Sequence, residues 1–407
     1  MKSAVIYGAG SIGRGFIGQL FSESGYRVVF IDVNRPLIGL LNASGQYPLR
    51  FVEDTRTTEV VVQNVCGVCA NDSAAVYEAI CTAGLMATSV GKNALPAVAE
   101  GIAGGLRFRW NNGNFSPFNI IVCENMLGAN TYLRELVLQH LHGAEAQHFR
   151  QCVGMVETCI GRNVPVMTEA LQDGDPLRVI AEPYNVLPVD SKTFVGPIPD
   201  VKYMKPCHPF DYYIQQKLFV YNMAHTLAAY LGNLLHIGLL AEAIRQEDIR
   251  RIAVGALREA GLALAREHHA DPDEIHAFCD ELLHRFENRR LGIAVWRVVQ
   301  DNKRKLSPDD RLAGSLEMCL RNGIAPTHIA VGIAAGYCYC SKDDPASLEI
   351  QDDIAAHGFS SALETYSGIR QGRSIHSYIV SVYEKLRGGA ALKEIADHAD
   401  VQAPNIL

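Results

Sequence analysis

Residues 3–34 read SAVIYGAGSIGRGFIGQLFSESGYRVVFIDVN. The β-branched run at 3–7 predicts a strand, and the amphipathic segment at 16–25 predicts a helix that ends at a glycine. A second apolar run at 26–34 predicts another strand, which ends in an acid. Strand, glycine-rich turn, helix and strand together form a βαβ unit, the element from which parallel sheets are built.

The turn of this unit carries three glycines at the spacing GxGxxG, namely Gly8, Gly10 and Gly13. The spacing alone is weak evidence, because such a turn can serve only tight packing. Here it follows a predicted strand and opens a helix, and Asp32 ends the next strand about 20 residues further on, which is the context of a dinucleotide-binding fingerprint. Without side chains the backbone can approach a pyrophosphate, whose charge the helix N-terminus favours.

This pattern predicts NAD as the cofactor. Asp32 can accept hydrogen bonds from ribose hydroxyls and would repel the 2′-phosphate of NADP, whereas Arg35 is the argument for NADP because an arginine can accommodate that phosphate. The residues expected to contact the cofactor belong to the turn, to the end of the second strand and to the end of the apolar run at 85–91. They are Gly8, Ala9, Gly10, Ser11, Ile12, Gly13, Arg14, Asp32, Asn34, Val90 and Gly91.

Beyond this unit, apolar and amphipathic segments continue to alternate, at 60–68, 75–84, 85–91, 92–106, 119–125 and 126–141. The alternation predicts a doubly wound, mainly parallel sheet. Between about 150 and 200, many prolines separate strand-like fragments, which favours extended strands and a connector. Helical patterns then dominate, at 212–231, 239–268, 273–287, 309–322, 326–340, 345–357 and 376–386. We therefore predict an α/β Rossmann-type doubly wound N-terminal domain with a strand-rich extension (1–204), followed by a mainly α-helical C-terminal domain (205–407).

The composition is that of a globular protein, with 48% hydrophobic and 20% charged residues and a net charge of −7. The negative charge argues against nucleic acid or an anionic membrane as the main partner. No apolar run reaches the roughly 18 residues that a membrane span needs, and the N-terminus runs directly into the first strand, with no room for a signal peptide. We expect a cytoplasmic protein that is a monomer or a small homo-oligomer.

The eleven cysteines do not suggest a disulfide framework, because their number is odd and they are scattered. Cys66 and Cys69 form a CxxC, and Cys338 lies close to Cys340, but neither pair has a second pair at the spacing of zinc ligands. We expect reduced cysteines that pack in the interior, and no metal site.

One helical segment, QQKLFVYNMAHTLAAYLG at 215–232, is apolar except for a few polar residues that include Lys217, Asn222 and His225. In a regular helix that stops at Gly232, Lys217 and His225 project about 80° apart, and Asn222 lies one turn before His225. All three can then reach one cleft. Each alone has a simpler explanation: a lysine that reaches solvent, an amide that bonds the backbone, a satisfied core histidine. Together, in a chain with a dinucleotide fold, they favour a catalytic site.

The pattern Lys-x4-Asn-x2-His on such a helix resembles the catalytic signature of the polyol-specific long-chain dehydrogenases. Further stretches similar to that family cover nearly the whole chain: YGAGSIGRGFIG near the start, ENM at 124–126, RFEN at 285–288, RKLSPDDRL at 304–312 and GIAA at 332–335. The resemblance implies metal-independent oxidoreduction of an open-chain polyol. It makes Lys217 the general base, has Asn222 and His225 hold the reacting oxygen, and adds Asn125 as a further oxyanion donor.

Such a reaction needs a base because an alcohol releases hydride only as its proton leaves. A lysine ordinarily titrates near 10.4, so burial and a neighbouring positive charge, such as that of oxidised nicotinamide, would be needed to keep Lys217 neutral. Amide and imidazole donors aimed at the developing alkoxide would stabilise it, by roughly 3 kcal/mol for each good donor.

The resemblance implies a sugar-alcohol phosphate and a ketose phosphate as substrates, D-mannitol 1-phosphate and D-fructose 6-phosphate. A phosphate needs a cationic pocket, and the candidates are KRKL at 303–306, Arg311, Arg297 and Lys92. The alternative is that these cations form a solvated surface.

Two departures from the family leave the substrate open. RRLG at 289–292 stands where relatives commonly have a proline and an acid, and VETCIGRNVP at 156–165 is less acidic than in similar members of the family. The same chemistry on an unphosphorylated polyol or a hexonate (mannitol, mannonate or altronate) is therefore the alternative. A non-catalytic dinucleotide-binding sensor is a more distant one, because a sensor would need only the residues between Gly8 and Asp32.

Overall fold

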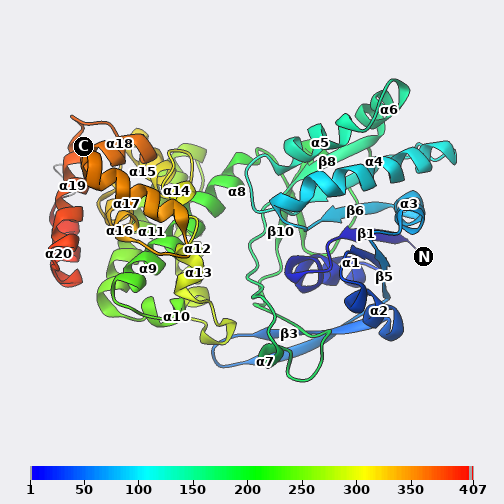
Figure 1. The fold of residues 1–407 in the computed structure, drawn as a ribbon, viewed down its shortest axis with the longest axis horizontal. Helices are drawn as coiled ribbons and strands as arrows, with labels where there is room; N and C mark the ends of the chain where they lie inside the picture. The colour runs from blue at the N-terminus through cyan, green and yellow to red at the C-terminus, as the bar shows by residue number, and fades with distance from the viewer. Residues whose placement is uncertain (1, 403–405, 407) are drawn as a thin grey trace. The chain divides into compact units, whose positions relative to one another are not determined.

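The computed structural model describes residues 2–402 and 406, and Figure 1 shows its helices and strands. The chain divides into two compact units, residues 1–211 and 212–407. The first unit contains the strands and the second is helical, so the predicted fold class is confirmed. No helix in the described part of the chain is long and apolar enough to cross a bilayer.

A six-stranded parallel sheet forms the centre of the first unit, in the order β5-β2-β1-β6-β7-β8. This is the strand order of the Rossmann fold, in which the chain starts in the middle of the sheet and winds outward in both directions. The strands are β1 (Ser3–Tyr7), β2 (Arg27–Asp32), β5 (Val65–Cys69), β6 (Leu85–Thr88), β7 (Phe118–Val122) and β8 (Val153–Glu157).

Alternate residues of these strands face opposite sides of the sheet, and both sides are covered. Ala4 and Ile6 of β1 pack in one apolar core, while Val5 and Tyr7 pack in another. The first side carries η1 (Gly13–Ile17), α1 (Gly18–Glu23) and α2 (Arg35–Ser44). The second carries α3 (Ser73–Thr82), α4 (Leu95–Asn111), α5 (Ala129–Gln139) and α6 (Ala144–Cys152). Strands buried on both sides explain the nearly continuous apolar runs in the sequence.

Two smaller sheets complete the first unit. One contains β4, β3 and β9, and the other pairs β10 with β11. Their bounds are β3 (Gln46–Val52), β4 (Thr57–Gln63), β9 (Val179–Ala181), β10 (Leu187–Asp190) and β11 (Met204–Cys207); the short helices η2 (Lys92–Ala94), α7 (Glu169–Gln172) and η3 (Ser191–Thr193) lie between strands. The apolar segment at 60–68 is therefore not a single strand. Asn64 takes a left-handed conformation (φ 58°) and separates β4 from β5, which belong to different sheets.

The second unit is a helical bundle around α9 and α16, whose residues are nearly all buried. Gly332 and Gly336 of α16 lie against Leu227 and Tyr230 of α9, and a Cβ at either glycine would fall 3.0 Å or less from those side chains. The helices are α8 (Asp211–Gln215), η4 (Gln216–Asn222), α9 (Met223–Leu234), α10 (Leu240–Ala243), α11 (Glu247–His268), α12 (Pro272–Phe286), η5 (Arg289–Leu291), α13 (Val295–Val299), α14 (Asn302–Lys305), α15 (Ala313–Arg321), α16 (Thr327–Cys338), α17 (Pro345–His357), α18 (Phe359–Ser367), α19 (Ser374–Arg387) and α20 (Leu392–Gln402).

Two details of the predicted helices are wrong. The pattern at 239–268 is not one helix, because it breaks after α10 and Gln246 caps the start of α11 by accepting a hydrogen bond from the Ile249 N–H. Gly232 does not end the lysine-bearing helix, which continues to Leu234. Gly232 is instead a packing position, where a Cβ would lie 2.7 Å from the Cβ of Ala243.

Candidate functional site

The glycine turn follows β1 and is held in shape by two of its three glycines. Gly8 has φ +104°, and a Cβ there would lie 2.4 Å from the carbonyl oxygen of Ser89. A Cβ at Gly13 would lie 2.0 Å from the carbonyl oxygen of Gly8, so neither position accepts a side chain. At Gly10, which is exposed, a Cβ would meet nothing within 4 Å. The outer side of the turn therefore leaves room beside the backbone, as a bound pyrophosphate requires.

Asp32 lies at the end of β2 and joins that strand to the glycine turn. One carboxylate oxygen accepts a hydrogen bond from the Ala9 N–H at 2.7 Å, and the other accepts one from the Asn34 N–H at 2.9 Å. Asn34 in turn caps α2 through its side chain. Each carboxylate oxygen can accept a further hydrogen bond, so Asp32 fits a ribose while it also fixes the turn.

Arg14 points inward, which the sequence did not indicate. Its guanidinium is buried and donates to the carbonyl oxygens of Ala9 and Leu177, both at 2.7 Å. Burial lowers the pKa of Arg14 below the ordinary value for arginine. The side chain therefore braces the turn from within, and only the backbone of Arg14 remains to face a cofactor.

The ends of β6 and β7 hold the remaining predicted residues of the first unit. Val90 and Gly91 follow β6, and their N–H groups donate to the two carboxylate oxygens of Glu124, at 3.0 and 2.8 Å. Asn125, the next residue, is exposed. Ser89 Oγ donates to the Gly8 carbonyl oxygen at 3.2 Å, so this loop also contacts the glycine turn. The prediction of site residues omitted Glu124, although an acid at the end of a central strand was a visible signal.

In the second unit, the lysine-bearing helix contains a widened turn. The helix begins at Asp211, is of the π type over η4 (Gln216–Asn222) and returns to α-helical form in α9. The hydrogen bonds of a π-helix span five residues, so residues five apart lie on the same side. A regular α-helix would separate Lys217 and Asn222 by about 140°. The widened turn thus brings the two half-buried side chains to one side.

His225 follows one turn later with its ring packed between aromatic residues. The ring stacks on Tyr221, with centroids 5.9 Å apart, and meets Phe286 edge-on at 5.3 Å. Its Nε2 atom is buried and has no hydrogen-bond partner among the described residues. Burial, and after it the positive charges of Arg311, Lys305 and Arg285, lower the pKa of His225 to about 3. The imidazole is therefore neutral near pH 7, and its orphan nitrogen is suited to a hydroxyl group of a ligand.

The lowered pKa of His225 predicts that this residue makes the folded protein less stable in acid. The unfolded chain binds a proton at His225 below its ordinary pKa of 6.5, whereas the folded protein does not until about pH 3, so stability falls as the pH drops through this window. Between about pH 7.5 and pH 5, urea unfolding should show the wild type losing about 2 kcal/mol more than His225→Gln. His284→Gln, at a side chain that is 80% exposed, is the matched control and should titrate like the wild type. An equal loss in His225→Gln would contradict the prediction.

The predicted cations differ in their surroundings. Lys303 pairs with Glu349 at 2.6 Å, Arg304 pairs with Asp301 and Asp310, and Arg297 and Lys92 are exposed on different units. These four side chains thus lie at the surface, as the alternative of a solvated surface expects. Lys305 and Arg311 are different because they are buried.

Lys305 and Arg311 are the two predicted cations whose charges lower the pKa of His225. Arg311 Nη1 approaches Thr226 Oγ1 at 3.4 Å, and its Nε pairs with Asp310 at 2.7 Å. Lys305 donates to the carbonyl oxygen of Val298 at 2.6 Å and to that of Gln300. Burial, followed by the charges of Arg311 and Arg304, lowers the pKa of Lys305 to about 7.

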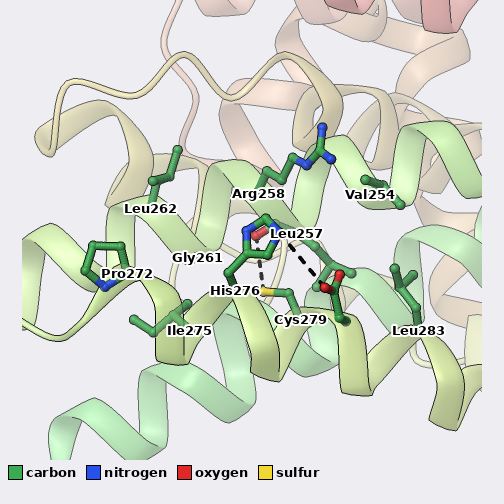
Figure 2. A pocket seen from close by; sticks show the side chains of 11 residues that line it. Val254, Leu257, Arg258, Gly261, Leu262, Pro272, Ile275, His276, Cys279 and Leu283 are labelled. Carbon is green, nitrogen blue, oxygen red and sulfur yellow. Dashed lines mark hydrogen bonds and ion pairs between the residues drawn. The ribbon is translucent and has the colours of Figure 1, made fainter.

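A separate hollow of about 170 Å³ lies between α11 and α12 (Figure 2). None of the predicted site residues lines it. Most residues that line it are apolar, and Arg258, His276 and Asp280 are its polar lining residues. The Sγ atom of Cys279 contacts the Leu257 carbonyl oxygen. Within the described chain, no group of three or more histidine, cysteine or acidic side chains is arranged to hold a metal ion.

The parallel sheet, the glycine turn and the acid that ends β2 define a dinucleotide-binding protein. Two family models match the chain: the mannitol dehydrogenase Rossmann domain over residues 2–203 and the mannitol dehydrogenase C-terminal domain over residues 210–399. The chain belongs to the mannitol dehydrogenase family, and the resemblance predicted from its motifs is confirmed.

Relatives match over nearly their whole length. Mannitol-1-phosphate 5-dehydrogenase of Brevibacillus brevis is 35% identical over 94% of this chain and 98% of its own, and the enzyme of the same name from Bacillus licheniformis is 35% identical over 93% and 98%. Among solved structures, Pseudomonas fluorescens mannitol 2-dehydrogenase in complex with NAD and D-mannitol has a TM-score of 0.75 at 15% identity, covering 98% of this chain and 94% of that one. A D-sorbitol dehydrogenase has a TM-score of 0.80 at 13% identity, covering 97% and 95%. These structures share the fold.

Proposed function

We propose that this protein is an NAD-dependent dehydrogenase that interconverts D-mannitol 1-phosphate and D-fructose 6-phosphate without a metal ion. Four relatives named mannitol-1-phosphate 5-dehydrogenase support the substrate, since they are 32–35% identical over 93–95% of this chain. The observation that carries the proposal is the set of Lys217, Asn222 and His225 on one widened helix of such a chain. A phosphorylated substrate does not cross membranes unaided, so we place the enzyme in the cytoplasm.

NAD binds to the first unit in this proposal. The glycine turn cradles the pyrophosphate beside Gly10, and Asp32 accepts hydrogen bonds from the adenosine ribose, which favours NAD over NADP. When bound, NAD⁺ accepts the hydride that leaves the alcohol carbon. Val90 and Gly91 contact the cofactor at the ends of the central strands, where ligands of parallel sheets bind.

The side chains of this protein handle the proton and the oxygen. Lys217 is the general base that removes the hydroxyl proton during oxidation, and the same group returns it during reduction. Asn222 and Asn125 donate hydrogen bonds to the developing alkoxide. His225, neutral and with an orphan Nε2, completes the set of groups that hold this oxygen.

The phosphate ester provides the sharpest test. Steady-state rates of NADH oxidation should be measured with fructose 6-phosphate, fructose and fructuronate. We expect fructose 6-phosphate to have by far the highest kcat/KM, because the buried Lys305 and Arg311, whose positive charges act on His225, suit an anionic substrate. If the phosphate ester gave no advantage, the assignment would be wrong. A preference for fructuronate would favour the hexonate alternative, which the arginines at 289–290 also suit.

A further inference from the structure

Glu124 is a buried acid that lies two residues beyond the end of β7. Only 6% of its surface is exposed, and its two carboxylate oxygens accept hydrogen bonds from the N–H groups of Val90 and Gly91. Gly91 has φ +85°, a conformation that favours glycine. The carboxylate therefore fixes the course of the loop that follows β6, and it does so from the residue adjacent to Asn125.

Within residues 2–402 and 406, no lysine, arginine or histidine forms an ion pair with the carboxylate of Glu124. Burying a charge is costly unless an opposite charge or hydrogen bonds compensate, and two backbone N–H groups supply only part of what water would provide. A glutamine could accept only one of the two hydrogen bonds, because its NH2 group would face the other N–H. The loop therefore needs a carboxylate here, and that carboxylate also brings a negative charge to this end of the sheet.

The position of Glu124 suggests which positive charge its carboxylate can attract. Asp32, at the end of β2, marks the half of the sheet that takes the adenosine ribose, so the ends of β6 and β7 face the nicotinamide half of a bound dinucleotide. The nicotinamide ring carries a positive charge in NAD⁺ and none in NADH. We propose that Glu124 is a positioning residue for the loop at 90–91 and that its carboxylate favours the oxidised over the reduced cofactor. This inference rests on the proposed binding of NAD to the first unit.

The test compares the dissociation constants of NAD⁺ and NADH, measured by calorimetry, in the wild type and in Glu124→Gln. Removing the charge should weaken the binding of NAD⁺ about tenfold more than that of NADH. Only the oxidised ring is positively charged and loses its attraction to the carboxylate, in an environment where charges are poorly screened. A tenfold change in this ratio raises the potential of the bound couple by about 30 mV. Glu100→Gln removes the same charge from an exposed position on α4 and should change neither constant. Equal weakening of both cofactors would reduce Glu124 to a structural role and overturn the proposal.

A second measurement does not depend on whether the variant folds. Benzamide adenine dinucleotide has the shape of NAD⁺ but an uncharged ring, so the wild type should bind it about tenfold more weakly than NAD⁺. Equal affinity would contradict the proposal. Failure of the wild type to bind NAD⁺ or NADH would instead refute the proposed cofactor. The enzyme could also prove inactive on every ketose tested while Glu124→Gln still changed the ratio of the NAD⁺ and NADH dissociation constants. That result would support this inference and refute the proposed substrate.

Discussion

Lys217→Ala should lower kcat for oxidation of mannitol 1-phosphate by about 10² or more, as expected for the loss of a general base. The dissociation constant of NADH should stay nearly unchanged, because the glycine turn and Asp32 belong to the first unit and Lys217 to the second. The rate of the wild type should rise with pH as the base loses its proton, and this dependence should disappear in the variant. Steady-state kinetics over a range of pH, with NADH binding measured by fluorescence, provide the test.

The control for this variant is Lys393→Ala, which removes an exposed lysine from α20 of the same unit and should leave kcat unchanged. A small primary amine added to Lys217→Ala should restore part of the rate, because it can take the proton in place of the missing side chain. A variant that is folded, binds NADH and turns over like the wild type would mean that another group is the base. The buried Lys305, with a pKa of about 7, would then be the first candidate.

Gly13→Ala should reduce both stability and cofactor affinity, whereas Gly10→Ala should reduce affinity alone. A Cβ at Gly13 would lie 2.0 Å from the Gly8 carbonyl oxygen and 2.9 Å from Ser89 Oγ, so the turn or the loop after β6 must shift. Overpacking of this kind typically lowers the free energy of unfolding by about 1–3 kcal/mol, and the displaced backbone should weaken the binding of NADH at least about tenfold. A Cβ at Gly10 meets no protein atom within 4 Å but would occupy the space proposed for the pyrophosphate.

Urea unfolding and NADH titration of the two variants separate these effects. Gly39→Ala is the control, since a Cβ there has nothing within 4 Å and α2 should gain up to about 1 kcal/mol from the higher helix propensity of alanine. If Gly10→Ala bound NADH as tightly as the wild type, the pyrophosphate would not lie against Gly10. If Gly13→Ala were fully stable, the close contact across the turn would be less rigid than its geometry indicates.

The first unit was largely predictable because its signals are local. A β-branched strand, a glycine turn and a terminal acid lie within 34 residues and identify both the element order and the end of the sheet that binds a ligand. The break between β4 and β5 was missed for a physical reason. Asn64 changes the direction of the chain because it takes a left-handed backbone conformation. The apolar run at 60–68 and its periodicity do not predict this conformation.

The parts of the candidate site that depend on distant contacts could not be predicted. Arg14 sits in a cofactor-binding motif, yet its direction is set by the carbonyl oxygen of Leu177, far along the chain. The cation run at 303–306 reads as a uniform patch, but packing buries Lys305 and leaves Lys303 paired at the surface. The hydrogen-bond partners of Glu124 are likewise backbone N–H groups of another loop, and a sequence does not indicate which backbone groups a side chain will contact.

The π-type turn between Gln216 and Asn222 has a consequence for how this helix can vary. Such a turn holds one residue more than an α-helical turn would over the same rise, so it amounts to a single insertion absorbed without breaking the helix. Removing one residue between Lys217 and Asn222 would let the helix close to regular α form, in which residues four apart lie on the same side, so the two side chains would stay together. A further inserted residue could not be absorbed in this way and would rotate Lys217 by about 100° relative to α9, so this turn should tolerate the loss of one residue better than the gain of one.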